Sequence, residues 1–184
     1  MTLLNNALSS TAHRLNEHLL NTFPSPDPWV ICCNLSRPDG TPEAGTENKI
    51  VATLLGLTPQ TTVANYNPTH GSGDGYTPVQ PPLFLNAFIL FTANFAGARY
   101  LDGLNMLSRT IGFFQANPVF SAQNLPGLDP GIDKLTFEME HLSFEDQSTV
   151  MAAQKALYLP SVAYKLRGMV FQSDGLVAEI PAIS

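Results

Sequence analysis

The residues around position 72 come closest to a constellation for nucleophilic chemistry. His70, Ser72 and Asp74 are the side-chain types of a hydrolase triad: base, nucleophile and orienter. All three stand within one short loop, where a base cannot easily reach both of its partners. The run Gly71-Ser72-Gly73-Asp74-Gly75 also differs from the strand-turn-helix Gly-x-Ser-x-Gly elbow, and it lacks the signatures of phosphate-binding and EF-hand calcium loops. We interpret it as a flexible loop and keep a hydrolase as an alternative.

Two carboxylates form a second candidate. Glu138 and Glu140 project from one face of a predicted strand and could act as an acid and base pair. No second catalytic element accompanies them, whereas Lys165 and Arg167 alternate in the same way along a later strand. We therefore interpret these four side chains as a solvated or salt-bridged strand face, in which each cross-strand pair contributes roughly 0.2–1 kcal/mol.

The other titratable side chains do not indicate a metal or cofactor site. His13 and His18 are five positions apart, so with Glu17 they form a polar helix face and not the i, i+4 histidine pair of a zinc helix. His141 falls on the apolar face of its predicted strand, which indicates a core or interface histidine. Cys32 and Cys33 are adjacent in a β-type run, where mutual pairing would be strained, so we expect reduced structural thiols.

The composition indicates a subunit of a larger assembly. Of the 184 residues, 44% are hydrophobic and 13% charged, against roughly 25% charged in typical soluble domains. Such a chain stays in solution when part of its apolar surface is covered by another chain. The formal charge of -6 disfavours nucleic acid as a partner, because it repels phosphate backbones.

No segment predicts secretion or membrane insertion. The sequence after Met1 lacks the basic region of a signal peptide, so we expect synthesis in the cytoplasm. The most apolar stretch, 83–98, is interrupted by polar residues and is shorter than the roughly 20 residues that span a bilayer.

Hydrophobic periodicity predicts a mixed α/β (α+β) fold in a single domain over residues 1–184, with one twisted mixed sheet, an N-terminal helix, two further helices and long loops. The predicted helices cover 3–20, 101–114 and, after an N-cap at Ser143, the residues up to 157. The predicted strands cover 29–35, 49–57, 83–91, 135–141 and 162–170, and a long mobile loop covers 58–80.

Local signals at three segments lead to sharper expectations. Ser143 and Asp146 have the spacing of a capping box. Strands 135–141 and 162–170, joined through a helix, should lie parallel in a right-handed crossover. The apolar run 176–180 should pair at a sheet edge, within or between subunits.

An ordered set of short motifs carries a family resemblance over essentially the whole chain. The motifs are Pro81-Pro82-Leu83, Tyr100-Leu101-Asp102-Gly103-Leu104, Ile111-Gly112-Phe113-Phe114-Gln115-Ala116-Asn117-Pro118, Leu142-Ser143-Phe144-Glu145-Asp146 and Leu159-Pro160-Ser161-Val162-Ala163-Tyr164-Lys165-Leu166-Arg167. Together they resemble the cap or tail-terminator family of phage-tail-like contractile injection systems, of the antifeeding-prophage and virulence-cassette type. Met151 departs from the family, which often has tryptophan there. The structural residues of these motifs are Pro82, Phe114, Ser143, Pro160, Ser161 and Tyr164.

The resemblance implies a non-enzymatic subunit without cofactor or metal. Such a protein assembles in the bacterial cytoplasm as a homohexameric ring, ends inner-tube growth and anchors the last sheath layer of a particle that can be released from the cell. Its partners would be copies of itself, tube and sheath proteins and an adaptor ring, without nucleic acid or direct membrane insertion. A monomeric small-ligand-binding domain is a further alternative. The candidate interface residues are Tyr66, His70, Asp74, Tyr76, Glu138, Glu140, Lys165, Arg167, Leu176, Val177 and Ile180.

Overall fold

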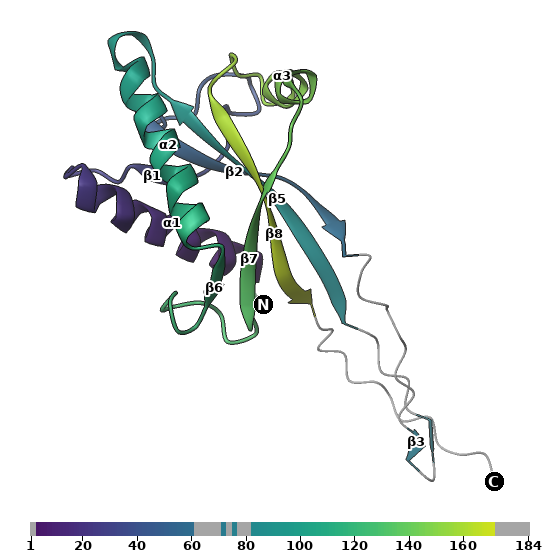
Figure 1. The fold of residues 1–184 in the computed structure, drawn as a ribbon. Helices are drawn as coiled ribbons and strands as arrows, with labels where there is room; N and C mark the ends of the chain where they lie inside the picture. Colours follow the sequence, from purple (N-terminus) through teal and green to yellow (C-terminus); the bar gives the residue numbers. More distant parts are fainter. Residues whose placement is uncertain (1–2, 61–70, 73–74, 77–81, 172–184) are drawn as a thin grey trace.

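The computed structural model describes residues 3–60, 71–72, 75–76 and 82–171. Within these residues the chain forms three α-helices, a short 3-10 helix and two β-sheets (Figure 1). The helices are α1 (Leu3–Thr22), η1 (Gly97–Arg99), α2 (Tyr100–Ala116) and α3 (Phe144–Ala153). The strands are β1 (Val30–Cys32), β2 (Lys49–Pro59), β3 (Gly71–Ser72), β4 (Gly75–Tyr76), β5 (Leu83–Asn94), β6 (Val119–Ser121), β7 (Lys134–Glu140) and β8 (Ser161–Phe171).

The main sheet has the order β1-β2-β5-β8-β7-β6 and is mixed. β1 and β2 are parallel, and the other neighbouring strands of this sheet are antiparallel. β5 lies between β2 and β8, so the aromatic and aliphatic run that it contains forms an interior strand. The predicted mixed α+β fold is confirmed.

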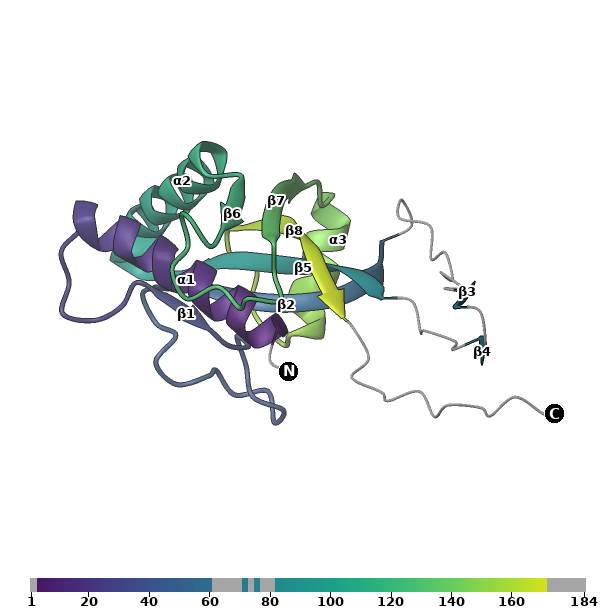
Figure 2. The same cartoon turned by 90° about the horizontal axis from the view of Figure 1, so that it is seen from below.

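Helices α1 and α2 lie side by side on one side of the sheet, while α3 stands apart from them (Figures 1 and 2). The apolar stripe of α1 buries Leu15 and Leu19 completely, as helical spacing predicts. α2 ends at Ala116, directly before Asn117-Pro118, because a residue that precedes proline avoids the helical region. α1 and α2 are each slightly longer than the periodicity predicts.

An aromatic cluster fills the space between α2 and the sheet. The ring of Phe114 lies 4.6 Å from that of Phe137, 4.7 Å from Tyr164 and 5.0 Å from Phe91, measured between centroids. These partners belong to β7, β8 and β5, and Phe120 of β6 joins the same cluster. The core on this side is therefore built around one side chain of α2.

The other side of the sheet carries a smaller core beneath α3. Met151 of α3 packs with Leu35, Val51, Leu90 and Ala163, and all of them are buried. The helix begins with the predicted capping box. The Ser143 hydroxyl accepts a hydrogen bond from the Asp146 N–H at 3.1 Å, and the Asp146 carboxylate accepts one from the Ser143 N–H at 3.3 Å.

The predicted parallel crossover is wrong, because β7 and β8 are antiparallel neighbours. α3 ends at Ala153 and not near 157, and residues 154–160 lead the chain back to Ser161, the first residue of β8. The connection therefore acts as a wide hairpin. α3 packs on the opposite side of the sheet from α1 and α2, so it does not cover the apolar face that a crossover helix would cover.

The alternation predicted for β7 fails at its end. Leu135 and Phe137 are buried, but Met139 is 57% exposed. His141 lies beyond the strand and is exposed, so its predicted place in an apolar face is wrong. β6 pairs with β7 only as far as Thr136, and the aromatic cluster ends at Phe137. No part of the aromatic cluster therefore covers the side chains at the end of β7, although the alternation predicts that they are buried.

A register shift makes the burial pattern of β8 differ from the predicted alternation. Opposite Leu85 and Ala87 of β5 the pairing slips by one residue, and Gly168 adopts a φ of 105° at this point. Met169 is consequently fully buried, and Val170, which the alternation placed inside, is half-buried.

The predicted loop over 58–80 is shorter than expected where the structure describes it. β2 continues to Pro59, and β3 pairs with β4 in a short antiparallel ladder. At the N-terminal side, β1 covers only three residues of the β-type run that begins at Trp29.

Removal of the α3 cap should destabilise the protein. Ser143→Ala leaves the Asp146 N–H without its side-chain acceptor, so we expect the free energy of unfolding to fall by about 1 kcal/mol. Urea unfolding followed by circular dichroism measures the change. Ser148→Ala, at an exposed position of the same helix, should change stability by less than about 0.5 kcal/mol. Equal effects of the two substitutions would contradict the role of the cap.

A side chain at Gly168 should be poorly tolerated. The backbone φ of 105° is rare for other residues, and an added Cβ would collide with the Lys134 carbonyl oxygen. We expect Gly168→Ala to lower the free energy of unfolding by more than about 1 kcal/mol. Gly112→Ala on α2, where a Cβ meets no neighbour within 4 Å, should be neutral or stabilising. An unchanged thermal midpoint for Gly168→Ala would refute this account of the bulge.

Candidate functional site

The four charged residues predicted to share a strand face lie on neighbouring strands. Glu138 stands opposite Lys165, and Glu140 stands opposite Ala163. Arg167 donates a hydrogen bond from Nη1 to Glu138 Oε1 at 3.0 Å. Lys165 places its ammonium 5.8 Å from the Phe88 ring centroid. The sheet therefore brings these side chains together as a half-exposed charged cluster on one face.

This arrangement supports an interaction surface better than a catalytic centre. The Glu138 carboxylate is engaged by a guanidinium, and a hollow of about 560 Å³ beside the pair is lined by Thr136, Gly168 and Val170 among others. An exposed ion pair of this kind contributes at most about 1 kcal/mol to stability. No nucleophile and base are paired in this hollow among the described residues.

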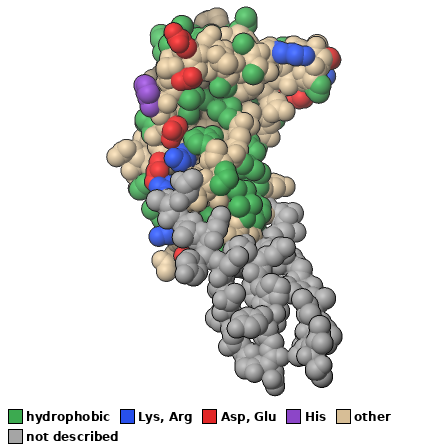
Figure 3. Space-filling model, turned by 90° about the vertical axis from the view of Figure 1, so that its right-hand side faces the viewer, with side chains coloured by type: hydrophobic (Ala, Val, Ile, Leu, Met, Phe, Trp, Pro, Cys, Tyr) green, Lys and Arg blue, Asp and Glu red, His purple; other side chains and the backbone are tan. Residues whose placement is uncertain are grey.

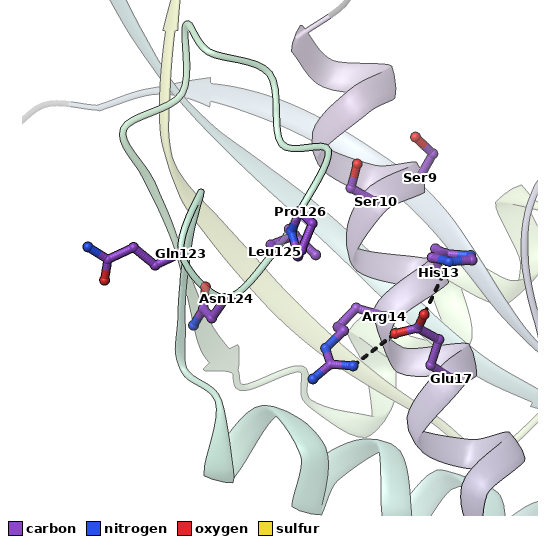
Figure 4. A pocket seen from close by; sticks show the side chains of 9 residues that line it. All are labelled: Ser9, Ser10, His13, Arg14, Glu17, Gln123, Asn124, Leu125 and Pro126. Carbon is purple, nitrogen blue, oxygen red and sulfur yellow. Dashed lines mark hydrogen bonds and ion pairs between the residues drawn. The ribbon is translucent and has the colours of Figure 1, made fainter.

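A hollow of about 840 Å³ lies between α1 and the segment after β6 (Figure 4). On the α1 side of this hollow, the Glu17 carboxylate lies 2.8 Å from Arg14 Nη1 and 3.4 Å from His13 Nε2. The hydrogen bond from Arg14 is the main reason that the pKa of Glu17 lies below its ordinary value. Gln123, Asn124, Leu125 and Pro126 form the other wall (Figure 4). The hollow has both polar and apolar residues in its lining, and its Glu17 carboxylate is already paired with Arg14.

The histidines of α1 do not assemble a metal site. His13 is exposed beside Glu17, as expected for a polar helix face. His18 instead places its ring 5.2 Å from that of Phe113. Among the residues described by the structure, no three His, Cys, Asp or Glu side chains are grouped as metal ligands.

The two cysteines are poor nucleophiles. Neither forms a disulfide, in agreement with the expected reduced thiols. Although part of the Cys32 side chain is exposed, surrounding protein and the adjacent Cys33 raise its pKa to about 11. Burial also raises the pKa of Cys33. Both thiols are therefore protonated at neutral pH, which removes the reactive thiolate form.

The structure describes only part of the predicted interface. Tyr76 belongs to β4, where its backbone pairs with Gly71. Tyr66, His70, Asp74, Leu176, Val177 and Ile180 lie outside the described residues. The predicted pairing of 176–180 at a sheet edge therefore remains an expectation.

The structural motif residues surround the central strands. Pro82 directly precedes β5, and Ser161 begins β8. The Pro160 carbonyl accepts a hydrogen bond from the Ala93 N–H at 2.9 Å, which joins the start of β8 to β5. Burial raises the pKa of Tyr164 to about 12, so its hydroxyl stays neutral within the aromatic cluster.

Exposed apolar side chains near α3 form a surface that the sequence analysis missed. Phe144 is 72% exposed, Leu157 86% and Tyr158 53%. Their exposure was not predicted, because the sequence analysis extended this helix to residue 157. Helical periodicity alone does not show which apolar residues lie outside the core. A side view of the molecule shows apolar side chains at the surface beside small mixed groups of charges (Figure 3). Such a surface suits protein partners better than a polyanion.

A helix that crosses a bilayer must be both long and apolar. Within the part of the chain that the structure describes, none is both long and apolar enough to span one.

Comparisons with known proteins agree on one fold. The structure is similar to the "PVC sheath/tube terminator in extended state" of an extracellular contractile injection system, with a TM-score of 0.61 and 9% identity over 98% of this chain and 60% of that chain. It is also similar to the anti-feeding prophage cap, described as the AFP tube terminating cap, with a TM-score of 0.53 and 9% identity over 95% of this chain and 57% of that chain.

The chain thus spans about 60% of the length of the terminator and 57% of the cap. A sequence comparison with curated proteins gives no match. The family model of the Pvc16 N-terminal domain matches residues 7–184. Because this match covers nearly the whole chain, the protein belongs to the Pvc16 N-terminal domain family.

Proposed function

We propose that this chain is a non-enzymatic cap subunit of a contractile injection system. In this proposal, six copies form a ring at the end of the inner tube, stop its growth and anchor the last sheath layer. The observation that carries the proposal is the fold, which corresponds over 98% of the chain to a sheath/tube terminator. Family membership over residues 7–184 supports the same assignment.

The surface chemistry supports a structural role. The chain has few charged residues, yet it exposes large apolar side chains at ordered positions such as Phe144 and Leu157. These features are typical of a protein whose surface is covered on assembly. A ring of identical chains needs two different complementary surfaces on each copy, because its contacts are heterologous. The charged face around Glu138 and Arg167 and the sequence segment 58–80 are our candidates for contact with tube, sheath or an adaptor ring. Segment 176–180 is our candidate for pairing at a sheet edge, within or between subunits.

The alternatives have less support. A hydrolase would need a nucleophile and base in contact. Glu138 is engaged by Arg167, and His70 and Asp74, the predicted partners of Ser72, lie outside the described residues. A monomeric ligand-binding domain would need an enclosed apolar cavity. The hollow beside α1 and the hollow beside Glu138 are instead surface depressions with charged side chains in their walls. We further propose that the chain is made and assembled in the cytoplasm before the particle is released.

Loss of this protein should disturb particle length. We expect deletion of its gene to yield absent, unstable or irregularly long particles, because nothing would end tube growth. Electron microscopy of purified particles measures the length distribution. Complementation with the wild-type gene should restore a single length, and Ser72→Ala should restore it equally because no hydrolysis is involved. Particles of normal length in the deletion strain would refute an essential terminating role.

A further inference from the structure

An ordered apolar projection stands beside α3. It consists of Phe144, Leu157 and Tyr158, and we call it the α3 projection. The rings of Phe144 and Tyr158 lie 5.6 Å apart, and the Tyr158 hydroxyl donates a hydrogen bond to the Gln147 side chain at 3.3 Å. Leu157, exposed to 86%, is its most exposed member.

The projection is held in place from below. Met151 of α3 and Leu159 pack in the small core on the sheet, and the capping box fixes the start of the helix. These contacts limit the freedom of the exposed side chains before any partner binds. Exposed aromatic and aliphatic side chains that are ordered in advance are typical of binding hot spots, because binding then costs little conformational entropy.

A matching groove lies where α1 ends and α2 begins, and we call it the α1–α2 groove. Phe23, Pro24, Trp29 and Met106 supply its apolar lining, within a volume of about 350 Å³. The Trp29 indole N–H donates to the Phe23 carbonyl at 2.7 Å, which fixes the outer wall. The volume is near the lower end of the roughly 300–1,000 Å³ range of binding pockets, so the groove can accept a small number of projecting side chains.

The charges at the two surfaces are complementary. Glu145 and Asp146 flank the projection in the first turn of α3. At the groove, Arg109 lies over the Phe23 ring at 5.0 Å, and Arg99 lines the wall together with Asp102. Since Arg99 is paired with Asp102 at 3.2 Å, the acidic groups beside the projection would meet Arg109 beside the groove.

The two surfaces cannot meet within one chain. In Figure 1, α3 lies to the upper right of the sheet, whereas the ends of α1 and α2 that form the groove lie to its left. A neighbouring copy, however, can present its projection to this groove. Repetition of one such heterologous contact closes a ring when the rotation between copies is a simple fraction of a turn.

We propose that the α3 projection of one copy inserts into the α1–α2 groove of the next copy. This inference rests on the ring in the proposed function and names the surfaces that build it. Phe144, Leu157 and Tyr158 supply the apolar contact, and Glu145 faces Arg109 at the rim.

Photo-cross-linking in assembled particles tests the contact. A benzophenone amino acid replaces Leu157, and a matched control places it at Val119, an exposed apolar residue of β6. After irradiation, we expect a dimer of this chain from position 157, with the cross-link mapped by mass spectrometry to the peptide that contains Phe23 and Trp29. Position 119 should not give this cross-link.

Other outcomes separate the contact from the ring. If rings form but position 157 cross-links to another protein of the particle, or to a different surface of this chain, the proposed contact is wrong and the ring stands. If the unmodified chain forms no ring in particles, both this contact and the proposed function fail.

Charge reversal provides an independent readout. Arg109→Glu and Glu145→Arg should each weaken the association between copies about two- to fivefold per contact, as expected for an exposed ion pair. The double variant should recover association, because the charges are then exchanged. Native mass spectrometry measures the ring fraction, and circular dichroism verifies the fold of each variant. Additive losses in the double variant would overturn the pairing.

Discussion

The packing of Phe114 against the sheet is the contact on which the rest of the structure depends. The ring centroid of this one side chain of α2 lies within 5.0 Å of the centroids of aromatic rings from β5, β7 and β8. Aromatic pairs in such geometries contribute roughly 0.5–1.5 kcal/mol beyond the burial of their area. The cluster therefore fixes α2, and through α2 the neighbouring α1, to the strands in the middle of the sheet. The α1–α2 groove depends on this arrangement, whereas the α3 projection rests on the separate small core around Met151.

Local sequence signals predicted the elements well. The leucine spacing of α1 and the apolar run of β5 require only short-range periodicity, and the structure contains both. The capping box at Ser143 was predicted for the same reason, since its two partners are three residues apart. The paired charges of Glu138 and Arg167 also followed from alternation along two strands.

Features set by distant contacts could not be predicted in this way. The direction of β8 relative to β7 depends on where α3 packs, and the helix sequence does not specify the side of the sheet. The bulge at Gly168 changes which residue of β8 is buried. In the sequence it is marked only by an isolated glycine before the continuous apolar run Met169-Val170-Phe171, and this run does not show which of its residues faces the core. Trp29 and Met106 both line the groove, and their proximity depends on the arrangement of both helices on the sheet.

The fold links the chain to terminators, and its surface suggests how copies could associate. Exposed apolar side chains and an apolar groove at a separate place are compatible with a closed ring, whose heterologous contacts need two different surfaces on each copy. Nothing in this account requires a reactive side chain. The pKa values of both cysteine thiols are raised, and Glu17 in the hollow beside α1 is paired with Arg14 and His13. The proposed function rests on shape and assembly.

A three-dimensional reconstruction of the end of the particle tests the central claim most directly. The account predicts six copies of this chain in a single closed layer on the last ring of the inner tube, at one end of the particle. Copies distributed along the particle, or an end layer that lacks this chain, would contradict it.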